Sequence, residues 1–281
     1  HVARLVMSAF YNVAPENKLR VIAPDVGGGF GSKIYIYPEE IVCLWASKKS
    51  GVPVKWVSDR TEAFLTDAHG RDHVTHVEMA FDKGNNIVGL KVDTIANLGA
   101  YMSLFSSATP TYLYATLLSG QYNIPAIHAN VRTVYTNTVP VDAYRGAGRP
   151  EATFVMERTM ETAARELGVS PTELRRQNFV KSFPHQTPVI MCYDAGDFSA
   201  SLDAAMKAAD YAGFEKRRAK AAKAGKLRGI GSTGAPLPVP GFNAPGSLGA
   251  DFHDFFRRLR GRGGDVMHGE DTSFCRRWIQ G

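Results

Sequence analysis

Hydrophobic and polar residues alternate most clearly in two neighbouring segments. Residues 75–81 and 87–96 alternate or run apolar on either side of the polar stretch Asp82-Lys-Gly-Asn-Asn86. A period of two is typical of β-strands, and a short glycine-containing turn between two such segments predicts a β-hairpin. Two shorter apolar runs, residues 19–23 and 52–57, are also predicted to be strands.

Other segments carry apolar residues at helical spacing. Residues 150–167 follow this pattern up to Gly168, where a helix is predicted to end. Ser170 and Glu173 have the spacing of a capping box, and a helix to about residue 180 should follow them. Together the strands and helices indicate an α+β fold with mixed sheets and packed helices. The remaining predicted helices cover residues 2–10, 39–49, 199–211 and 214–224.

Composition and charge narrow the class of protein. The 281 residues are 44% hydrophobic and 21% charged, as expected for a globular chain that buries a core. The net charge of +6 is concentrated in a basic segment, residues 216–228. No aromatic residues interleave with these charges, so a solvated helix face is favoured over a nucleic-acid site. The sequence has no signal peptide and no apolar run of membrane-spanning length, so a cytoplasmic location is expected.

Cysteines and histidines do not form a metal-binding pattern. The three cysteines lie far apart without C-x-x-C spacing, which argues against a disulfide scaffold and against a zinc or iron–sulfur site in this chain. Cys43 lies in an apolar stretch and is expected in the core. His69, His73 and His76 are close in sequence, but an odd separation on a predicted strand puts His73 and His76 on opposite faces. No metal ligand is predicted. The cysteines are Cys43, Cys192 and Cys275.

The segment Ala23-Pro-Asp-Val-Gly-Gly-Gly-Phe-Gly-Ser-Lys33 is rich in glycine. Without Cβ atoms, such a turn lets backbone N–H groups approach a polar or anionic ligand closely. The order Gly31-Ser32-Lys33 does not fit a P-loop, and the spacing also fails the G-x-G-x-x-G dinucleotide motif. A structural glycine turn remains the alternative.

A second motif, Val141-Asp-Ala-Tyr-Arg-Gly-Ala-Gly-Arg-Pro-Glu-Ala152, leads from an apolar run into a helix with Pro150 at its first position. Arg145 and Arg149 lie in its glycine-containing loop. Guanidinium groups bind phosphate and other oxyanions through paired hydrogen bonds, so this loop is a candidate anion site. Structural ion pairing is the alternative for both arginines.

The two motifs, GGGFGSK and AYRGAGRPEA, resemble the molybdopterin-binding large subunit of the molybdenum hydroxylases, the family of xanthine dehydrogenase, aldehyde oxidase and aerobic carbon monoxide dehydrogenase. The resemblance covers residues 1–231, and it implies that they form part of a molybdopterin-binding domain. It also implies that the chain is incomplete at both ends. It assigns cofactor binding to six residues: Gly28, Gly29, Phe30, Gly31, Arg145 and Gly146.

Three positions depart from the better-known branches of this family. Copper-containing carbon monoxide dehydrogenases carry a cysteine where this chain has Gly146, and a soft metal such as Cu(I) has no ligand without that thiolate. The chain therefore resembles the carbon monoxide dehydrogenase-like branch. A substrate-contacting glutamate of xanthine dehydrogenase corresponds to Ile34, and an aromatic residue beside the purine corresponds to Ala147. Purine specificity is not expected.

The resemblance also implies cofactors and partners. The cofactor is molybdopterin cytosine dinucleotide with molybdenum, and iron–sulfur clusters and FAD lie on an iron–sulfur subunit and an FAD-binding medium subunit, in a dimer of heterotrimers. The intact parent would oxidise a small molecule, an aldehyde, an N-heterocycle or carbon monoxide, with water as oxygen source. The family's catalytic glutamate lies in a part that this chain does not reach, so no catalytic residue is assigned here and the fragment alone should be inactive.

Residues 232–281 do not resemble the family. They combine closely spaced prolines with an Arg/Gly-rich stretch and lack sustained periodicity, so a disordered or artefactual tail without function is predicted. Two other functions stay open for the body of the chain. It could be a non-catalytic interaction module in which the glycines form a packing turn, or a nucleotide-binding enzyme, although the motif spacings argue against the latter.

Overall fold

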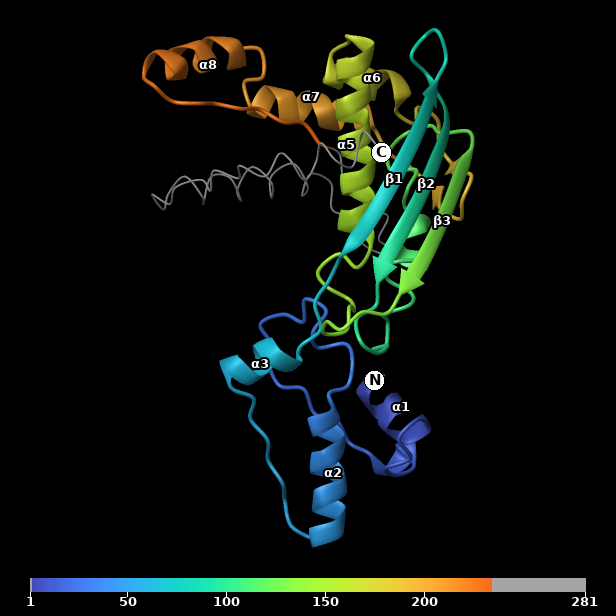
Figure 1. Ribbon diagram of the computed structural model, residues 1–281, viewed down its shortest axis with the longest axis vertical. Helices are drawn as coiled ribbons and strands as arrows, with labels where there is room; N and C mark the ends of the chain where they lie inside the picture. Colours follow the sequence, from blue (N-terminus) through green and yellow to red (C-terminus); the bar gives the residue numbers. More distant parts are fainter. Residues whose placement is uncertain (1, 234–281) are drawn as a thin grey trace. The chain divides into compact units, whose positions relative to one another are not determined.

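The computed structural model describes residues 2–233 (Figure 1). The predicted tail therefore lies outside the described residues, except for its first two positions. The chain divides into two compact units, each made of three separate stretches. Within the described residues, unit 1 consists of residues 2–74, 94–115 and 130–151, and unit 2 consists of residues 75–93, 116–129 and 152–233.

The main sheet has three strands in the order β1-β2-β3 (Figure 1). A hairpin joins the first two strands, and its turn is held by Asp82, whose Oδ1 accepts hydrogen bonds from the backbone N–H groups of Gly84 and Asn86, both at 2.8 Å. Strands β2 and β3 run in the same direction, so the sheet is mixed. The hairpin and the mixed α+β class are both confirmed. The strands are β1 (His73–Phe81), β2 (Ile87–Asn97) and β3 (Ile127–Val134).

The helices follow the predicted pattern closely. The longest, α5, ends before Gly168, whose φ of 68° suits a glycine C-cap. None of the helices within residues 2–233 is long and apolar enough to cross a membrane. The helices are α1 (Val2–Ala9), η1 (Glu16–Lys18), α2 (Pro38–Ser50), α3 (Arg60–Thr66), α4 (Tyr112–Ala115), α5 (Arg149–Leu167), α6 (Pro171–Asn178), α7 (Phe198–Ala208) and α8 (Phe214–Lys223). A small second sheet pairs β4 (His185–Gln186) with β5 (Cys192–Tyr193).

Two predicted strands are wrong. Residues 19–23 and 52–57 are extended but irregular, and no described strand pairs with either segment. Their apolar side chains are largely exposed, with Ile22 and Val57 each 69% accessible. An apolar run becomes a strand only where a neighbouring strand takes up its backbone hydrogen bonds, and these two runs lack that neighbour.

Two smaller predictions also need correction. The capping box at the start of α6 does not form, because the Ser170 hydroxyl pairs with the Thr172 hydroxyl at 2.8 Å and caps no backbone N–H. Cys43 is only half-buried, and none of the residues of α2 is fully buried. The apolar face of α2 is therefore not part of the core within the described residues.

The core of unit 2 contains a buried polar network. Glu157 accepts a hydrogen bond from the Tyr122 hydroxyl at 2.6 Å and one from Arg175 Nε at 2.9 Å. All three residues are at most 8% exposed. Burial and the nearby Glu157 carboxylate raise the pKa of Tyr122 well above its ordinary value, so its hydroxyl keeps the proton that it donates. The network ties α5 to α6 at the centre of unit 2.

Replacing Arg175 by alanine should therefore destabilise unit 2 strongly. The change leaves the Glu157 carboxylate buried without its cation, which typically costs about 3–5 kcal/mol of unfolding free energy. Arg176→Ala is the matched control, because Arg176 pairs with the exposed Asp203 at the surface and surface pairs contribute little. Urea unfolding of the chain measures both variants. Equal stabilities of the two variants would contradict the structural role of the network.

Candidate functional site

The two glycine-containing loops meet within unit 1. The first loop, residues 27–33, precedes α2, and the second, residues 142–149, runs into the first residue of α5. A Cβ atom added to Gly31 would lie 1.8 Å from the carbonyl oxygen of Ala143 and 2.6 Å from its carbonyl carbon. Two backbones can approach this closely only where one residue has no side chain. The structure thus brings the two sequence motifs into direct contact.

Both loops adopt backbone conformations that favour glycine. The φ angles of Gly28 and Gly31 are 122° and 107°, a region that residues with a Cβ rarely occupy. Phe30 lies between them in the left-handed region, with a φ of 52°. Such conformations in residues other than glycine are held by their surroundings and are common at ligand sites. Positive φ angles occur in the two loops at Gly28, Phe30, Gly31, Gly146, Ala147 and Gly148.

Close packing also anchors the second loop. A Cβ atom on Gly148 would lie 2.7 Å from the carbonyl carbon of Leu113 and 2.8 Å from the carbonyl oxygen of Thr109. At the other end of the loop, Asp142 is only 1% exposed, and its carboxylate accepts a hydrogen bond from the N–H of Phe105 at 3.1 Å. The loop is therefore fixed at both ends before it enters α5.

Phe30 and Arg145 connect the tips of the two loops. The Arg145 guanidinium lies 5.6 Å from the centroid of the Phe30 ring, a cation–π contact. Phe30 is 56% exposed in spite of its apolar ring. The two predicted site residues thus form one exposed feature at the meeting point of the loops. The third candidate there, Gly146, packs against the ring of Pro150, because its Cβ would lie 2.5 Å from Pro150 Cδ.

The glycines of the first loop differ in what surrounds them. Apart from its chain neighbours, Gly27 has no atom within 4 Å of an added Cβ. At Gly29, the nearest such atom is Lys33 Cβ at 3.7 Å. Neither has a φ in the left-handed region. Packing within the described chain therefore requires glycine at Gly31 but not at Gly29. Apart from its chain neighbours, no described atom lies closer than 3.7 Å to a Cβ at Gly29, and we call this side of the loop the open face at Gly29.

A third segment, His69-Gly70-Arg71, packs along the second loop and was not predicted. His69 forms a parallel bridge with Val141, in which the Asp142 N–H donates to the His69 carbonyl at 2.9 Å. A Cβ atom on Gly70 would lie 2.4 Å from Tyr144 Cβ. Arg71 donates a hydrogen bond from Nη2 to the carbonyl oxygen of Arg145 at 3.0 Å. Only this tertiary contact reveals the segment, because its sequence carries no recognised motif.

Three arginines surround the second loop without a carboxylate partner. None of the three forms an ion pair with any residue that the structure describes. They are Arg71, Arg145 and Arg149. In addition, Arg71 Nη1 and Arg149 Nε are buried and find no hydrogen-bond acceptor among residues 2–233. Unpaired buried guanidinium N–H groups are costly. The loop therefore presents positive charge and free donors.

Two tyrosines and an aspartate hold the first loop from the side of α2. The Tyr37 hydroxyl lies 3.0 Å from the Ser32 carbonyl and 2.7 Å from Asp67 Oδ1. Tyr35 donates to the same carboxylate oxygen. Burial, followed by the hydrogen bond to Asp67, raises the pKa of Tyr35, and burial also raises the pKa of Tyr37. Both phenols are therefore neutral donors at physiological pH. Sequence reasoning missed this cluster.

The histidines near the site do not gather. The burial pattern of β1 alternates, so that His73 is half-buried and His76 is exposed, on opposite faces as predicted. His73 packs edge-on against the ring of Tyr114, and burial lowers its pKa. Among residues 2–233, no group of three or more histidine, cysteine, aspartate or glutamate side chains is placed to hold a metal ion.

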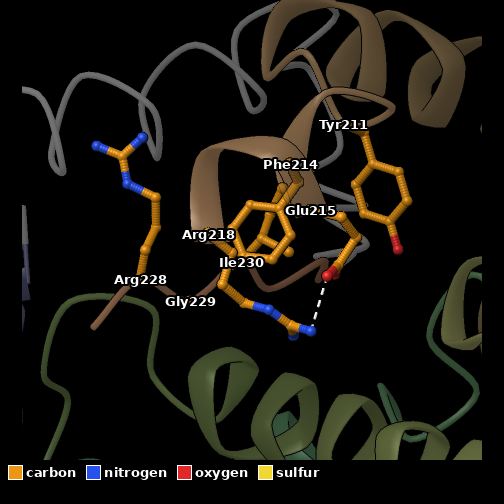
Figure 2. A pocket seen from close by; sticks show the side chains of 7 residues that line it. All are labelled: Tyr211, Phe214, Glu215, Arg218, Arg228, Gly229 and Ile230. Carbon is orange, nitrogen blue, oxygen red and sulfur yellow. Dashed lines mark ion pairs between the residues drawn. The ribbon is translucent and has the colours of Figure 1, made fainter. Parts of the chain in front are cut away.

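Two hollows lie away from the motif glycines. In unit 1, a hollow of about 350 Å³ borders the start of α2 and residues 137–140. Another, of about 400 Å³, lies in unit 2 between α8 and residues 228–230. Figure 2 shows the Phe214 ring of the second hollow beside Arg218, which pairs with Glu215 at 2.7 Å. The basic side chains of α8 are mostly exposed, as expected for a solvated face.

Comparison with known proteins agrees with the two motifs. The family described as molybdopterin cofactor-binding domain matches residues 1–179. The chain is 38% identical to a carbon monoxide dehydrogenase large chain of Hydrogenophaga pseudoflava, over 78% of this chain and 28% of that protein. It is 36% identical to the large subunit of a nicotine 6-hydroxylase of Paenarthrobacter nicotinovorans, over 82% of this chain and 28% of that protein.

A solved structure shows the same fold. The quinoline 2-oxidoreductase of Pseudomonas putida 86 aligns with a TM-score of 0.74 and 32% identity, over 79% of this chain and 28% of that one. The chain thus spans somewhat more than a quarter of the length of these relatives. The matched residues contain both glycine loops and the His69-Gly70-Arg71 segment. The chain therefore belongs to the molybdopterin cofactor-binding domain family of the molybdenum hydroxylases.

Proposed function

We propose that this chain forms one side of the cofactor site in the large subunit of a molybdenum hydroxylase, and that the cofactor is molybdopterin cytosine dinucleotide. The observation that carries the proposal is the contact between Gly31 and Ala143, which joins the two loops and leaves the face at Gly29 open. The proposed cofactor-binding residues are Gly28, Gly29, Phe30, Gly31, Arg145 and Gly146.

The residues present fit this group. A pterin dinucleotide is bulky and anionic. Its site therefore needs backbone N–H groups that the ligand can approach, and cationic side chains that are not already paired with a carboxylate. The open face at Gly29 meets the first need. The unpaired arginines supply the cationic side chains, and their free donors include the buried Nε–H of Arg149. No side chain has to ligate the metal, since the dithiolene sulfurs of the pterin hold molybdenum.

The chain's own contribution is binding and orientation. When bound, the molybdenum cofactor supplies the two-electron oxidation that inserts an oxygen from water into the substrate. The backbone of the first loop would bind the polar edge of the cofactor, and Arg145 would balance its negative charge. Phe30 would exclude water from one side of the reacting centre, which strengthens the electrostatic interactions there. The tyrosine pair at Asp67 keeps the first loop in place during turnover.

The substrate of the parent is proposed to be an aldehyde or an N-heterocycle. A thiolate is the protein ligand that Cu(I) prefers, and the second loop offers Gly146 at the position where copper-containing relatives have a cysteine. At Ile34 and Ala147, the chain also lacks the polar and aromatic side chains that would favour a purine. The nicotine hydroxylase relative is consistent with a heterocyclic substrate.

Electrons are proposed to leave through partner subunits. Two relatives are named a large chain and a large subunit, which supports an assembly with smaller subunits. The described part of this chain has no cluster of metal-binding side chains of its own. From the resemblance to the family, we propose iron–sulfur clusters and FAD on an iron–sulfur subunit and a medium subunit, in a dimer of heterotrimers.

Gly29→Val should abolish cofactor retention in the parent without unfolding it. A Cβ at Gly29 would meet nothing closer than 3.7 Å, and its φ is not one that disfavours a side chain, so we expect the effect to fall on the ligand at the open face. We expect molybdenum content to fall by about ten-fold or more, equivalent to about 1.4 kcal/mol of binding free energy. Gly231→Val, at an exposed and open glycine outside the loops, is the control. Normal molybdenum in purified Gly29→Val would contradict the assignment.

Gly31→Ala should act differently, by forcing the two loops apart. The new methyl group would collide with the Ala143 carbonyl at a backbone angle that favours glycine. We expect a loss of about 1–3 kcal/mol in unfolding free energy, together with loss of cofactor. Gly29→Ala should leave the stability unchanged. Chemical denaturation of both variants distinguishes the two roles, and equal stabilities would show that the loops do not meet at Gly31.

The parent should contain molybdenum but no stoichiometric copper. This follows from Gly146, which supplies no thiolate to a Cu(I) ion. Metal analysis of the purified enzyme, combined with assays on carbon monoxide, aldehydes and N-heterocycles, measures the outcome. Turnover of an aldehyde or a heterocycle without copper is expected. One copper ion per molybdenum with efficient carbon monoxide oxidation would contradict the proposed substrate class.

A further inference from the structure

Arg71 is held against the second loop by two contacts. Its Nη2 donates to the Arg145 carbonyl at 3.0 Å, and its guanidinium carbon lies 4.6 Å from the centroid of the Tyr144 ring. The first contact is with Arg145, a predicted site residue, and the second is with its sequence neighbour Tyr144. An arginine that binds a carbonyl while stacking on an aromatic ring has a fixed plane, so its remaining N–H groups point in defined directions.

The backbone beneath Arg71 is constrained as well. Arg71 and Asp72 both have a φ of 70°, which is unfavourable for residues with a Cβ. Asn97 holds this pair in place: its backbone N–H donates to the Asp72 carbonyl at 3.1 Å, and its side-chain amide donates to the Asp72 carboxylate at 2.7 Å. Asn97 is itself only 6% exposed. Adjacent left-handed residues fixed by a buried clamp are typical of functional sites.

One donor of Arg71 has no acceptor. Nη1 is buried and finds no hydrogen-bond partner among residues 2–233, and no described carboxylate pairs with the guanidinium. The same is true of Nε of Arg149, whose Nη1 binds the Gly146 carbonyl at 3.3 Å. Arg145 adds a third unpaired cation on the same loop. A single carboxylate would neutralise only one of these charges, whereas a pyrophosphate carries several charges and many acceptor oxygens.

We propose that Arg71 is a further residue of the cofactor site, which positions the Arg145 loop through Nη2 and binds a phosphate oxygen of the dinucleotide through Nη1. This inference rests on the proposed function for the identity of the ligand. The group that Arg71 would recognise is a pyrophosphate. Both the dinucleotide and free inorganic pyrophosphate carry this group. Arg71 is thus a binding residue and a positioning residue at once.

Binding of inorganic pyrophosphate to the whole large subunit, purified free of cofactor, tests this role by calorimetry. Arg71→Met should weaken binding by about ten-fold or more, because a charge-assisted hydrogen bond is lost. Arg71→Lys should restore part of the affinity, since a positive charge remains but cannot serve both acceptors. Arg132→Met, at an exposed arginine of β3, should bind like the wild type. Wild-type affinity in a folded Arg71→Met variant would overturn the proposal.

A second variant guards against misfolding. If Arg71→Met does not fold, pyrophosphate binding is measured on Arg71→Gln instead. The glutamine amide still has a donor for the Arg145 carbonyl but carries no charge. Weakened pyrophosphate binding by Arg71→Gln supports the proposal, and unchanged binding overturns it. Nucleotide and molybdenum content of the loaded wild-type subunit are measured separately. An empty wild type that still binds pyrophosphate through Arg71 would refute the proposed function while leaving the anion site intact.

Discussion

The site depends on one backbone contact, the approach of Gly31 to the carbonyl of Ala143. There is no room for a Cβ atom at this point, since it would lie 1.8 Å from the carbonyl oxygen. The contact fixes the first loop against the second, and Phe30 and Arg145 then meet at the loop tips. In the proposed site, this contact places Gly29 and Arg145 on two loops that touch. The proposed site therefore depends on glycine at position 31.

The surrounding residues stabilise that contact from three directions. Asp67 and its two tyrosines hold the first loop near Ser32. Buried Asp142 and the packing at Gly148 hold the second loop at its ends. The segment that contains Arg71 bridges to the second loop through the Arg145 carbonyl. The supports at Asp67, Asp142 and Arg71 Nη2 use polar groups whose partners lie within the chain. By contrast, Arg71 Nη1 and Arg149 Nε find no acceptor among residues 2–233.

Local patterns predicted much of the fold but not the packing that defines the site. The hairpin and α5 follow from periodicity and end signals that are contained in their own residues. Residues 19–23 and 52–57 were predicted to be strands because apolar runs look alike whether or not a partner strand exists. The different roles of Gly29 and Gly31 depend on Ala143, which is distant in sequence, so their spacing alone could not separate them. Arg71 carries no motif, and only its tertiary contacts identify it.

We infer that the two loops and the Arg71 segment together bind the molybdenum cofactor. An experimental structure of the cofactor-loaded large subunit tests it most directly. We expect cofactor oxygen atoms at about 2.7–3.2 Å from backbone N–H groups of the first loop and from the guanidinium of Arg71. A cofactor bound elsewhere, with the face at Gly29 covered by another part of the protein, would contradict it.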